Sequence, residues 1–191
     1  MPRQLLDSQI IYQGPIFEVE RDRLREDSGV EIVREVVKHP GGAGGLPFLD
    51  DGRVALVKQY RHPARKELLE IPAGRIERSE TPEECAAREI EGEVGVHVGR
   101  MEKLAEFYTT PGFCEEKLYI YLARDLTPAA QRLDHDEFIE VVWLPFADAL
   151  RWVREGKIED AKTIIALLLA AEAPAMSRDL SGCGSLRQPL R

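Results

Sequence analysis

Residues 74–96 constrain this chain more than any other segment, because they join a glycine turn to a helix with acids at fixed offsets. Thr81 is a good N-cap residue, and Pro82 follows at the first helical position, where its missing N–H does no harm. Glu83 and Glu84 then place negative charge in the first turn, near the positive end of the helix dipole. The segment predicts a loop that leads into a capped helix.

Two acids on this helix indicate a metal site. Glu89 and Glu93 are four residues apart, so their carboxylates project from one helical face. Like charges held so close repel each other unless a cation neutralises them. Oxygen ligands suit Mg²⁺, which proteins usually hold with one or two carboxylates, waters and the phosphates of a substrate. The pair predicts a Mg²⁺-dependent site for a phosphate-containing substrate, with Mn²⁺ as the alternative ion.

The segment resembles the Nudix box, whose pattern is Gly, five residues, Glu, seven residues, Arg-Glu, an apolar residue, any residue, Glu-Glu, any residue, Gly and an apolar residue. The positions that match at this spacing are Gly74, Glu80, Arg88, Glu89, Ile90, Glu93, Gly95 and Val96. Gly92 departs from it, because it stands where the first Glu of the Glu-Glu pair is expected. An ordinary acidic amphipathic helix is the alternative, and it explains neither the glycine turn nor the features downstream.

Apolar periodicity predicts strands and helices along the rest of the chain. Strands are expected at 10–12, 16–21, 30–37, 44–49, 53–60, 68–72, 104–108, 118–123 and 139–144. The segment 44–49 is a weak strand, because Pro47 lacks a ladder donor and favours an edge or a bulge. Besides the box helix, one helix is expected from about Ala147 and another over 161–172.

Three regions follow from this pattern. Residues 1–41 predict a small N-terminal β-sheet for dimerisation, because so small a sheet must pack on something else. Residues 42–172 predict a Nudix-type α/β/α sandwich with a mixed sheet, the fold that the resemblance implies. Residues 173–191 are rich in Pro, Ser and Gly and predict a disordered tail.

Composition excludes some partners. The net charge of -8 argues against binding to nucleic acid or to an anionic membrane. No apolar run approaches the length that spans a bilayer. The three cysteines are odd in number and widely spaced, which indicates neither a disulfide framework nor a zinc site and favours a reducing cytoplasm.

Two segments outside the box resemble the ADP-ribose pyrophosphatase branch of the family. Pro111 lies fifteen positions beyond the box, in a Thr-Pro-Gly loop that continues to Glu116. A plain type II turn with Gly112 at a positive φ is the alternative for this loop. Residues 58–63 are similar to the branch's Arg-Gln-Tyr-Arg-x-Pro segment, with Lys in place of the first Arg. The likeness makes Arg61 a candidate phosphate clamp, because a guanidinium fork fits a phosphate.

The resemblance also implies roles within the site. In the family, the carbonyl before the first glycine, here that of Ala73, completes the metal shell of Glu89 and Glu93. Arg88 is expected to orient these acids through ion pairs. In this branch a glutamate on the loop before the last strand is the general base or positions the attacking water, and spacing favours Glu137 for this role.

The N-terminal sheet is exchanged between the subunits of a dimer in this branch. The aromatic residue that stacks on adenine there matches Phe17, and the arginine that reaches the other subunit's substrate matches Arg34. Tyr12 competes with Phe17 for the stacking role, and core packing is the alternative for both.

The resemblance implies Mg²⁺-dependent hydrolysis of a nucleoside diphosphate sugar, with ADP-ribose expected to give AMP and ribose 5-phosphate. A GDP-mannose-type nucleotide-sugar hydrolase is one alternative. A nucleotide-sugar sensor weakened in catalysis by the missing acid at Gly92 is another. If position 92 belongs to the metal site, restoring a glutamate there should lower the Mg²⁺ requirement, and alanine should raise the melting temperature.

Overall fold

The computed structural model describes residues 3–133, 135 and 137–173, so the tail expected over 173–191 lies outside the described residues except for Ala173, which is buried. The elements, in chain order, are β1 (Gln4–Gln13), β2 (Glu18–Arg25), β3 (Glu31–Lys38), β4 (Gly42–Pro47), β5 (Arg53–Arg61), β6 (Lys66–Glu70), β7 (Ala73–Arg75), α1 (Pro82–Glu89), η1 (Ile90–Val94), β8 (Val96–Tyr108), β9 (Lys117–Pro128), β10 (Ile139–Pro145), α2 (Phe146–Arg154) and α3 (Ala161–Glu172).

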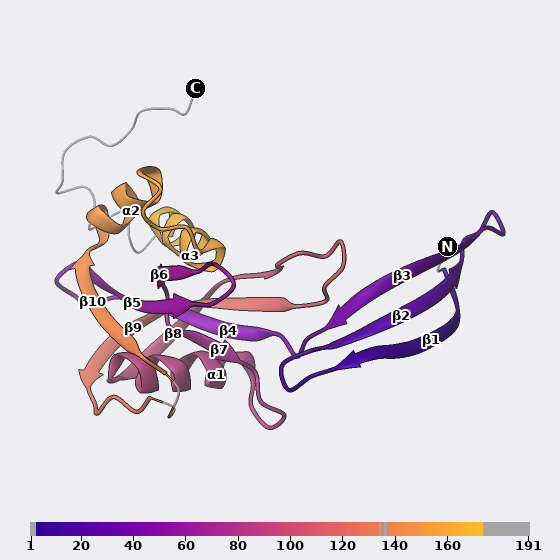
Figure 1. Cartoon of the computed structure of the whole chain (residues 1–191). Coiled ribbons are helices and arrows are strands. Elements are labelled where there is room, and N and C mark those ends of the chain that lie inside the picture. Colours follow the sequence, from indigo (N-terminus) through magenta and orange to yellow (C-terminus); the bar gives the residue numbers. More distant parts are fainter. Residues whose placement is uncertain (1–2, 134, 136, 174–191) are drawn as a thin grey trace.

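Strands β1, β2 and β3 form a separate antiparallel sheet that projects from the rest of the molecule (Figure 1). The strand expected over 16–21 was wrong at its start, since β2 begins at Glu18. Residues 14–17 form a turn instead, in which the amide of Gly14 donates to the carbonyl of Phe17 at 3.0 Å. The turn places Phe17 in a connection at the base of the projecting sheet.

The body of the molecule is a layered α/β fold, as expected. Its strands divide into two sheets, a mixed one of order β7-β4-β9-β8 and an antiparallel one of order β10-β5-β6. Helix α1 lies on one side of these sheets, and α2 and α3 lie on the other (Figure 1). The sequence predicts one mixed sheet in the body, whereas the structure has a mixed sheet and a separate antiparallel sheet.

Strand β4 lies inside the mixed sheet, so the edge position expected for it was wrong. It pairs in parallel with β9 and in antiparallel with β7, and Pro47 lies beyond the last residue that pairs with β7. The missing N–H of Pro47 therefore breaks no bond to that neighbour. The strand can be buried throughout because it is built from small residues: a β-carbon on Gly45 would lie 2.8 Å from Cδ1 of Ile90.

The box helix begins as its sequence predicts. Thr81 caps it, with its hydroxyl accepting from the amide of Glu84, whose carboxylate in turn accepts from the amide of Thr81. After Glu89 the helix widens into the π-helical turn η1, which ends at Gly95 with a φ of 75°. Such turns are frequent at functional sites. The π turn is a feature that the periodicity of the sequence does not reveal.

The main core lies between the sheets and the pair α2 and α3. It includes the buried side chains Leu46, Phe48, Leu56, Ile71, Ile120, Leu122, Phe146 and Leu167. In the described part of the chain, no helix is both long and apolar enough to cross a membrane.

Candidate active site

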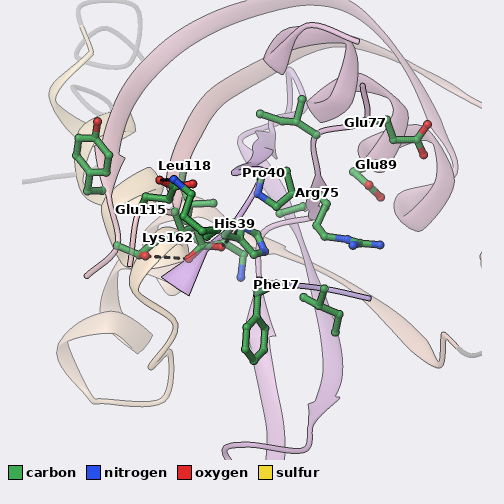
Figure 2. Close-up of a pocket in the computed structure, with 18 of the residues that line it drawn as sticks. Phe17, His39, Pro40, Arg75, Glu77, Glu89, Glu115, Leu118 and Lys162 are labelled. Atoms are coloured by element: carbon green, nitrogen blue, oxygen red, sulfur yellow. Dashed lines mark hydrogen bonds and ion pairs between the residues drawn. The ribbon is translucent and has the colours of Figure 1, made fainter. Parts of the chain in front are cut away.

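A cavity of about 1400 Å³ opens between the projecting sheet and the body (Figure 2). Many of the residues singled out from the sequence line it, although they come from separate elements. They are Phe17, Arg61, Ala73, Arg88, Glu89, Glu116 and Glu137. Glu93 lines a smaller adjoining cavity, which shares Arg88, Glu89 and Glu137 with the first.

The box glycine makes room for one of the acids. A β-carbon at Gly74 would lie 1.8 Å from Oε1 of Glu89, closer than any real contact. The carboxylate of Glu89 therefore occupies space that every other residue type would fill at position 74. Burial raises the pKa of Glu89, while its ion pair with Arg88 lowers it in part.

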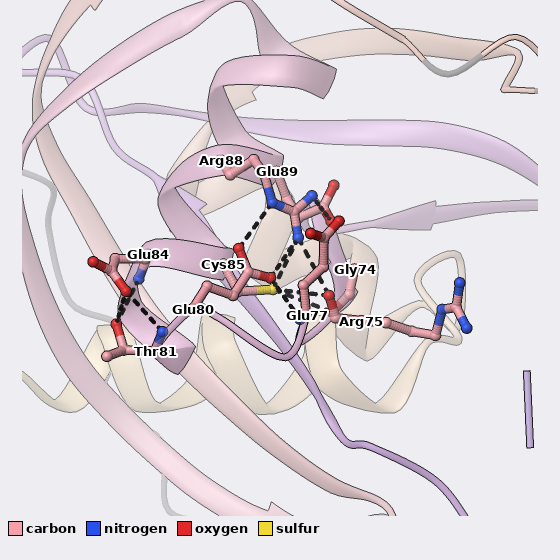
Figure 3. Close-up of polar contacts among 9 residues, drawn as sticks. All are labelled: Gly74, Arg75, Glu77, Glu80, Thr81, Glu84, Cys85, Arg88 and Glu89. Carbon is pink, nitrogen blue, oxygen red and sulfur yellow. Dashed lines mark hydrogen bonds and ion pairs between the residues drawn. The ribbon is translucent and has the colours of Figure 1, made fainter.

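Arg88 ties two of the box acids together (Figure 3). Its Nε and Nη2 donate to the two carboxylate oxygens of Glu80 at 3.0 and 2.7 Å, and its Nη1 donates to Oε1 of Glu89 at 2.7 Å. The same guanidinium donates to the carbonyl of Arg75 at 3.2 Å. The fork on Glu80 holds the pKa of that acid at about 2. Of the two acids that Arg88 is expected to orient, the structure pairs it with Glu89, and its other carboxylate partner is Glu80.

Glu93 lies on the π turn and is only 5% exposed. Its Oε2 is buried and has no hydrogen-bond partner within the described residues. Burial first, and then the charges of Glu89 and Glu137, raise the pKa of Glu93 to about 8. Burying an ionised carboxylate without a partner costs free energy, and a cation bound at Oε2 of Glu93 would offset this cost.

The donor set fits a hard divalent cation. Glu89 and Glu93 offer carboxylate oxygens at the smaller cavity, and Ala73, whose carbonyl the family resemblance implicates, lines the larger cavity together with Glu89. Among the described residues, no three His, Cys, Asp or Glu side chains form a metal cage by themselves. Two carboxylates with further oxygens from the substrate are a usual set for Mg²⁺. The orphaned Oε2 of Glu93 and the space opened by Gly74 therefore agree with the expected metal.

The loop after β9 is fastened to the π turn. The amide of Arg132 donates to the carbonyl of Gly92 at 2.8 Å, and Nε2 of Gln131 donates to the carbonyl of Glu93 at 2.7 Å. The loop then leads to Glu137, which is half-buried and lines both cavities. The sequence spacing does not predict these hydrogen bonds, because the one between Gln131 and Glu93 joins residues that are 38 positions apart.

Arg61 reaches the cavity from β5, and an acid that the sequence analysis missed holds it there. Its Nε and Nη2 donate to the two oxygens of Glu70 at 2.7 and 2.8 Å. Glu70 is 2% exposed, whereas the side chain of Arg61 is 41% exposed. The sequence does contain a signal for Glu70, because it is a charged residue inside the apolar strand before Pro72. A buried acid is almost always paired with a cation.

The aromatic residues of the projecting sheet meet at the rim. The rings of Tyr12 and Phe17 lie 5.5 Å apart, and both remain substantially exposed, so neither belongs to a core. Nη1 of Arg75, another residue missed from the sequence, donates to the carbonyl of Pro15 at 3.1 Å and ties β7 to the turn that carries Phe17. Arg34 is elsewhere: it lies on β3, donates to the carbonyl of Val33 at 2.8 Å and does not line the cavity of its own chain.

The loop between β8 and β9 is only partly at the cavity. Glu116 lines it and accepts from the hydroxyl of Thr109 at 2.8 Å. Pro111 and Gly112 lie in the exposed turn of this loop and do not line the cavity. Gly112 does not have a positive φ, so the type II turn offered as an alternative was wrong.

Comparison with known proteins agrees with the motifs. Residues 38–168 match the family model described as the NUDIX domain. An ADP-ribose pyrophosphatase of Bacillus subtilis (strain 168) is 38% identical over 159 residues, which cover 82% of this chain and 86% of that protein. A GDP-mannose pyrophosphatase of Yersinia pestis (strain Pestoides F) is 38% identical over 156 residues, which cover 76% of this chain and 78% of that protein.

A solved structure supports the fold. The crystal structure of an ADP compounds hydrolase superposes with a TM-score of 0.80 and covers 96% of this chain and 97% of its own, at 24% identity. The resemblance inferred from the box and the expected α/β fold are both confirmed.

Proposed function

The chain belongs to the NUDIX domain family, and from that premise we propose that it hydrolyses the pyrophosphate bond of a nucleoside diphosphate sugar. ADP-ribose is the first candidate, with AMP and ribose 5-phosphate as products. The observation that carries the proposal is the meeting of Glu89, Glu93 and Glu137 beside the box glycine, at a cavity large enough for a dinucleotide-sized ligand. The likeness to the ADP-ribose pyrophosphatase of B. subtilis supports the choice of substrate.

The proposed cofactor is Mg²⁺, with Mn²⁺ as the alternative, held by Glu89, Glu93 and the carbonyl of Ala73. When bound, such an ion neutralises charge that develops on the phosphates and lowers the pKa of a water. The residues of the chain do the positioning: Arg88 orients the acids, Arg61 holds phosphate oxygens, and Glu137 takes or directs the proton of the attacking water.

The projecting sheet supports a homodimer as part of the proposal. Leu5 and Ile10 are 56% and 53% exposed on a sheet of three strands, and no helix of the described residues packs against that sheet. A sheet of this size needs a further surface to pack on. In the dimer, Phe17 would stack on the base, and Arg34 would reach the substrate of the other subunit. Pro111, Gly112 and Glu116 would then close the site from the neighbouring loop.

GDP-mannose is the second candidate substrate, because a GDP-mannose pyrophosphatase shares the same 38% identity, although over 76% of this chain and not 82%. Incubation with ADP-ribose and with GDP-mannose in Mg²⁺, followed by phosphatase treatment and phosphate assay, separates the two. Faster turnover of GDP-mannose would overturn the choice of ADP-ribose.

A sensor without turnover is the remaining alternative. Calorimetric binding of ADP-ribose without AMP formation in excess Mg²⁺ would favour the sensor and contradict the enzyme. A cytoplasmic protein that binds neither nucleic acid nor membrane completes the proposal, on the strength of its net charge of -8 and its widely spaced cysteines.

A further inference from the structure

We propose that Glu70 and Lys162 are positioning residues, which hold the guanidinium of Arg61 toward the substrate's phosphates and keep this group of three side chains positive. The inference rests on the proposed function and goes beyond it, because neither residue belongs to the box or to the motifs singled out from the sequence.

The contacts form a continuous chain. Glu70 accepts the fork of Arg61, and Nζ of Lys162 donates to Oε2 of the same carboxylate. Lys162 is 12% exposed and lines the cavity from the first turn of α3 (Figure 2), and Arg61 lines the same cavity from β5. One buried acid is thus shared by two cations that both border the proposed phosphate site.

Because Arg61 and Lys162 share the carboxylate of Glu70, the number of cations around it determines the net charge next to a bound phosphate. A buried carboxylate with a single cation would cancel the charge of Arg61, whereas the second cation leaves the three side chains with one net positive charge. Asp160 also accepts from Lys162, at 3.0 Å, but its other oxygen caps α3 through the amide of Thr163. The positive end of the helix dipole offsets part of that acid's charge. The pKa of Glu70 is lowered by both cations against its burial, so the acid stays ionised.

The first turn of α3 is also fixed to the strand that leads into the box. The hydroxyl of the fully buried Thr163 accepts from the amide of Ile71 at 2.7 Å and donates to Asp160 at 2.6 Å. Lys162 therefore lies on a helical turn that these hydrogen bonds fix to the segment directly after β6. A lysine held in this way can set the orientation of Arg61 without touching the substrate.

A double-mutant cycle separates positioning from direct contact. Arg61→Met, Lys162→Met and the double variant are compared with the wild type for KM and kcat on ADP-ribose in Mg²⁺, and for calorimetric Kd with ADP-ribose in EDTA. Hydrogen bonds to charged groups suggest that Lys162→Met weakens binding about tenfold. The double variant should bind no more weakly than Arg61→Met, because Lys162 acts through Arg61. Lys162→Arg should recover most of the affinity.

Lys66→Met is the matched control, since Lys66 pairs with Glu159 between β6 and the segment before α3 but does not line the cavity. It should leave Kd and KM unchanged. Losses that multiply in the double variant, or an equal loss in Lys66→Met, would overturn the positioning role. Absence of AMP formation by the wild type would overturn the hydrolase alone, because the coupling is still measured in Kd. A wild type that does not bind ADP-ribose would overturn both.

Discussion

The carbonyl oxygen of Arg132 lies 3.2 Å from the point that a β-carbon on Gly92 would occupy. Gly92, which departs from the box pattern, is thus the residue that the loop leading to Glu137 approaches closely. The carbonyl of Gly92 also accepts from the amide of Arg132 at 2.8 Å, so a hydrogen bond joins the backbones of the two residues. A β-carbon at position 92 would therefore require the carbonyl of Arg132 to shift by a few tenths of an ångström.

This contact changes what we expect of two variants at position 92. From helix propensity alone, Gly92→Ala would stabilise the protein by about 1 kcal/mol. In the structure, that gain is offset by the shift that the carbonyl of Arg132 must make, so we expect a melting temperature close to that of the wild type. Gly92→Glu should lower kcat and leave the Mg²⁺ requirement no lower, because its longer side chain displaces the loop. Mg²⁺ titrations of the three proteins test this, and a lower Mg²⁺ half-saturation for Gly92→Glu would contradict it.

Gly74→Ala should inactivate the enzyme. Its β-carbon would meet the carboxylate of Glu89 at 1.8 Å, so the acid must leave the place it shares with Arg88. Loss of a well-placed electrostatic group commonly lowers kcat by about 10²-fold or more. The rate on ADP-ribose and the Mg²⁺ half-saturation should both be impaired. A variant within a few-fold of the wild type would show that Glu89 is not needed where the structure places it.

Short-range spacing explains why the box could be predicted from the sequence. The cap at Thr81 and the shared face of Glu89 and Glu93 depend on residues within four positions of each other, and local backbone geometry fixes such relations. Glu89 and Glu93 line the same smaller cavity, although a π turn begins between them that the sequence pattern does not indicate.

Contacts between distant segments explain what the sequence could not provide. Glu70 and Lys162 are 92 positions apart, and neither has a motif. The interior place of β4 was missed for a related reason. Pro47 indicates an edge locally, but the place of β4 between β7 and β9 depends on distant strands, and the missing donor is harmless because β7 ends its pairing at Gly44.

Glu137→Gln should lower kcat more than it raises KM. A group that directs the attacking water acts chiefly in the transition state, and general-base groups commonly contribute about 10²- to 10⁴-fold. Steady-state kinetics on ADP-ribose measure the split. If kcat is unchanged, Glu115 or Glu116, which line the same cavity, become the better choices for the base, together with Asp136, which lies outside the described residues.

Arg34→Ala should raise KM about tenfold, as expected for a lost charged hydrogen bond, and leave the dimer intact. Arg34 lies on β3 and does not line its own cavity, so it can reach a substrate only across a dimer. Arg21→Ala is the control, because Arg21 pairs with Glu35, which alternates with Arg34 to the opposite face of the sheet. Light scattering supplies the mass. A wild-type monomer of 21.6 kDa at micromolar concentration, or dissociation of Arg34→Ala, would contradict the assignment.

Glu93→Gln should lower kcat by about 10²-fold and remove a pH dependence of stability from the metal-free protein. Burial raises the pKa of Glu93 from 4.5 to about 8 in the folded state, so its contribution to stability is fully present below pH 4.5. That contribution is lost as the pH rises through about 8, because the unfolded chain ionises more readily. In EDTA, the melting temperature of the wild type should therefore fall, relative to that of Glu93→Gln, between pH 5 and 9.

Mg²⁺ should reverse this trend, since it binds the ionised carboxylate and gains affinity as the proton leaves. The stabilisation of the wild type by Mg²⁺ should grow with pH over the same range, while Glu93→Gln should respond weakly throughout. Thermal melts at fixed ionic strength, with and without Mg²⁺, measure both effects. Parallel pH profiles for the two proteins in EDTA would show that Glu93 ionises as an ordinary exposed acid, and its place as a metal ligand would then lose its physical basis.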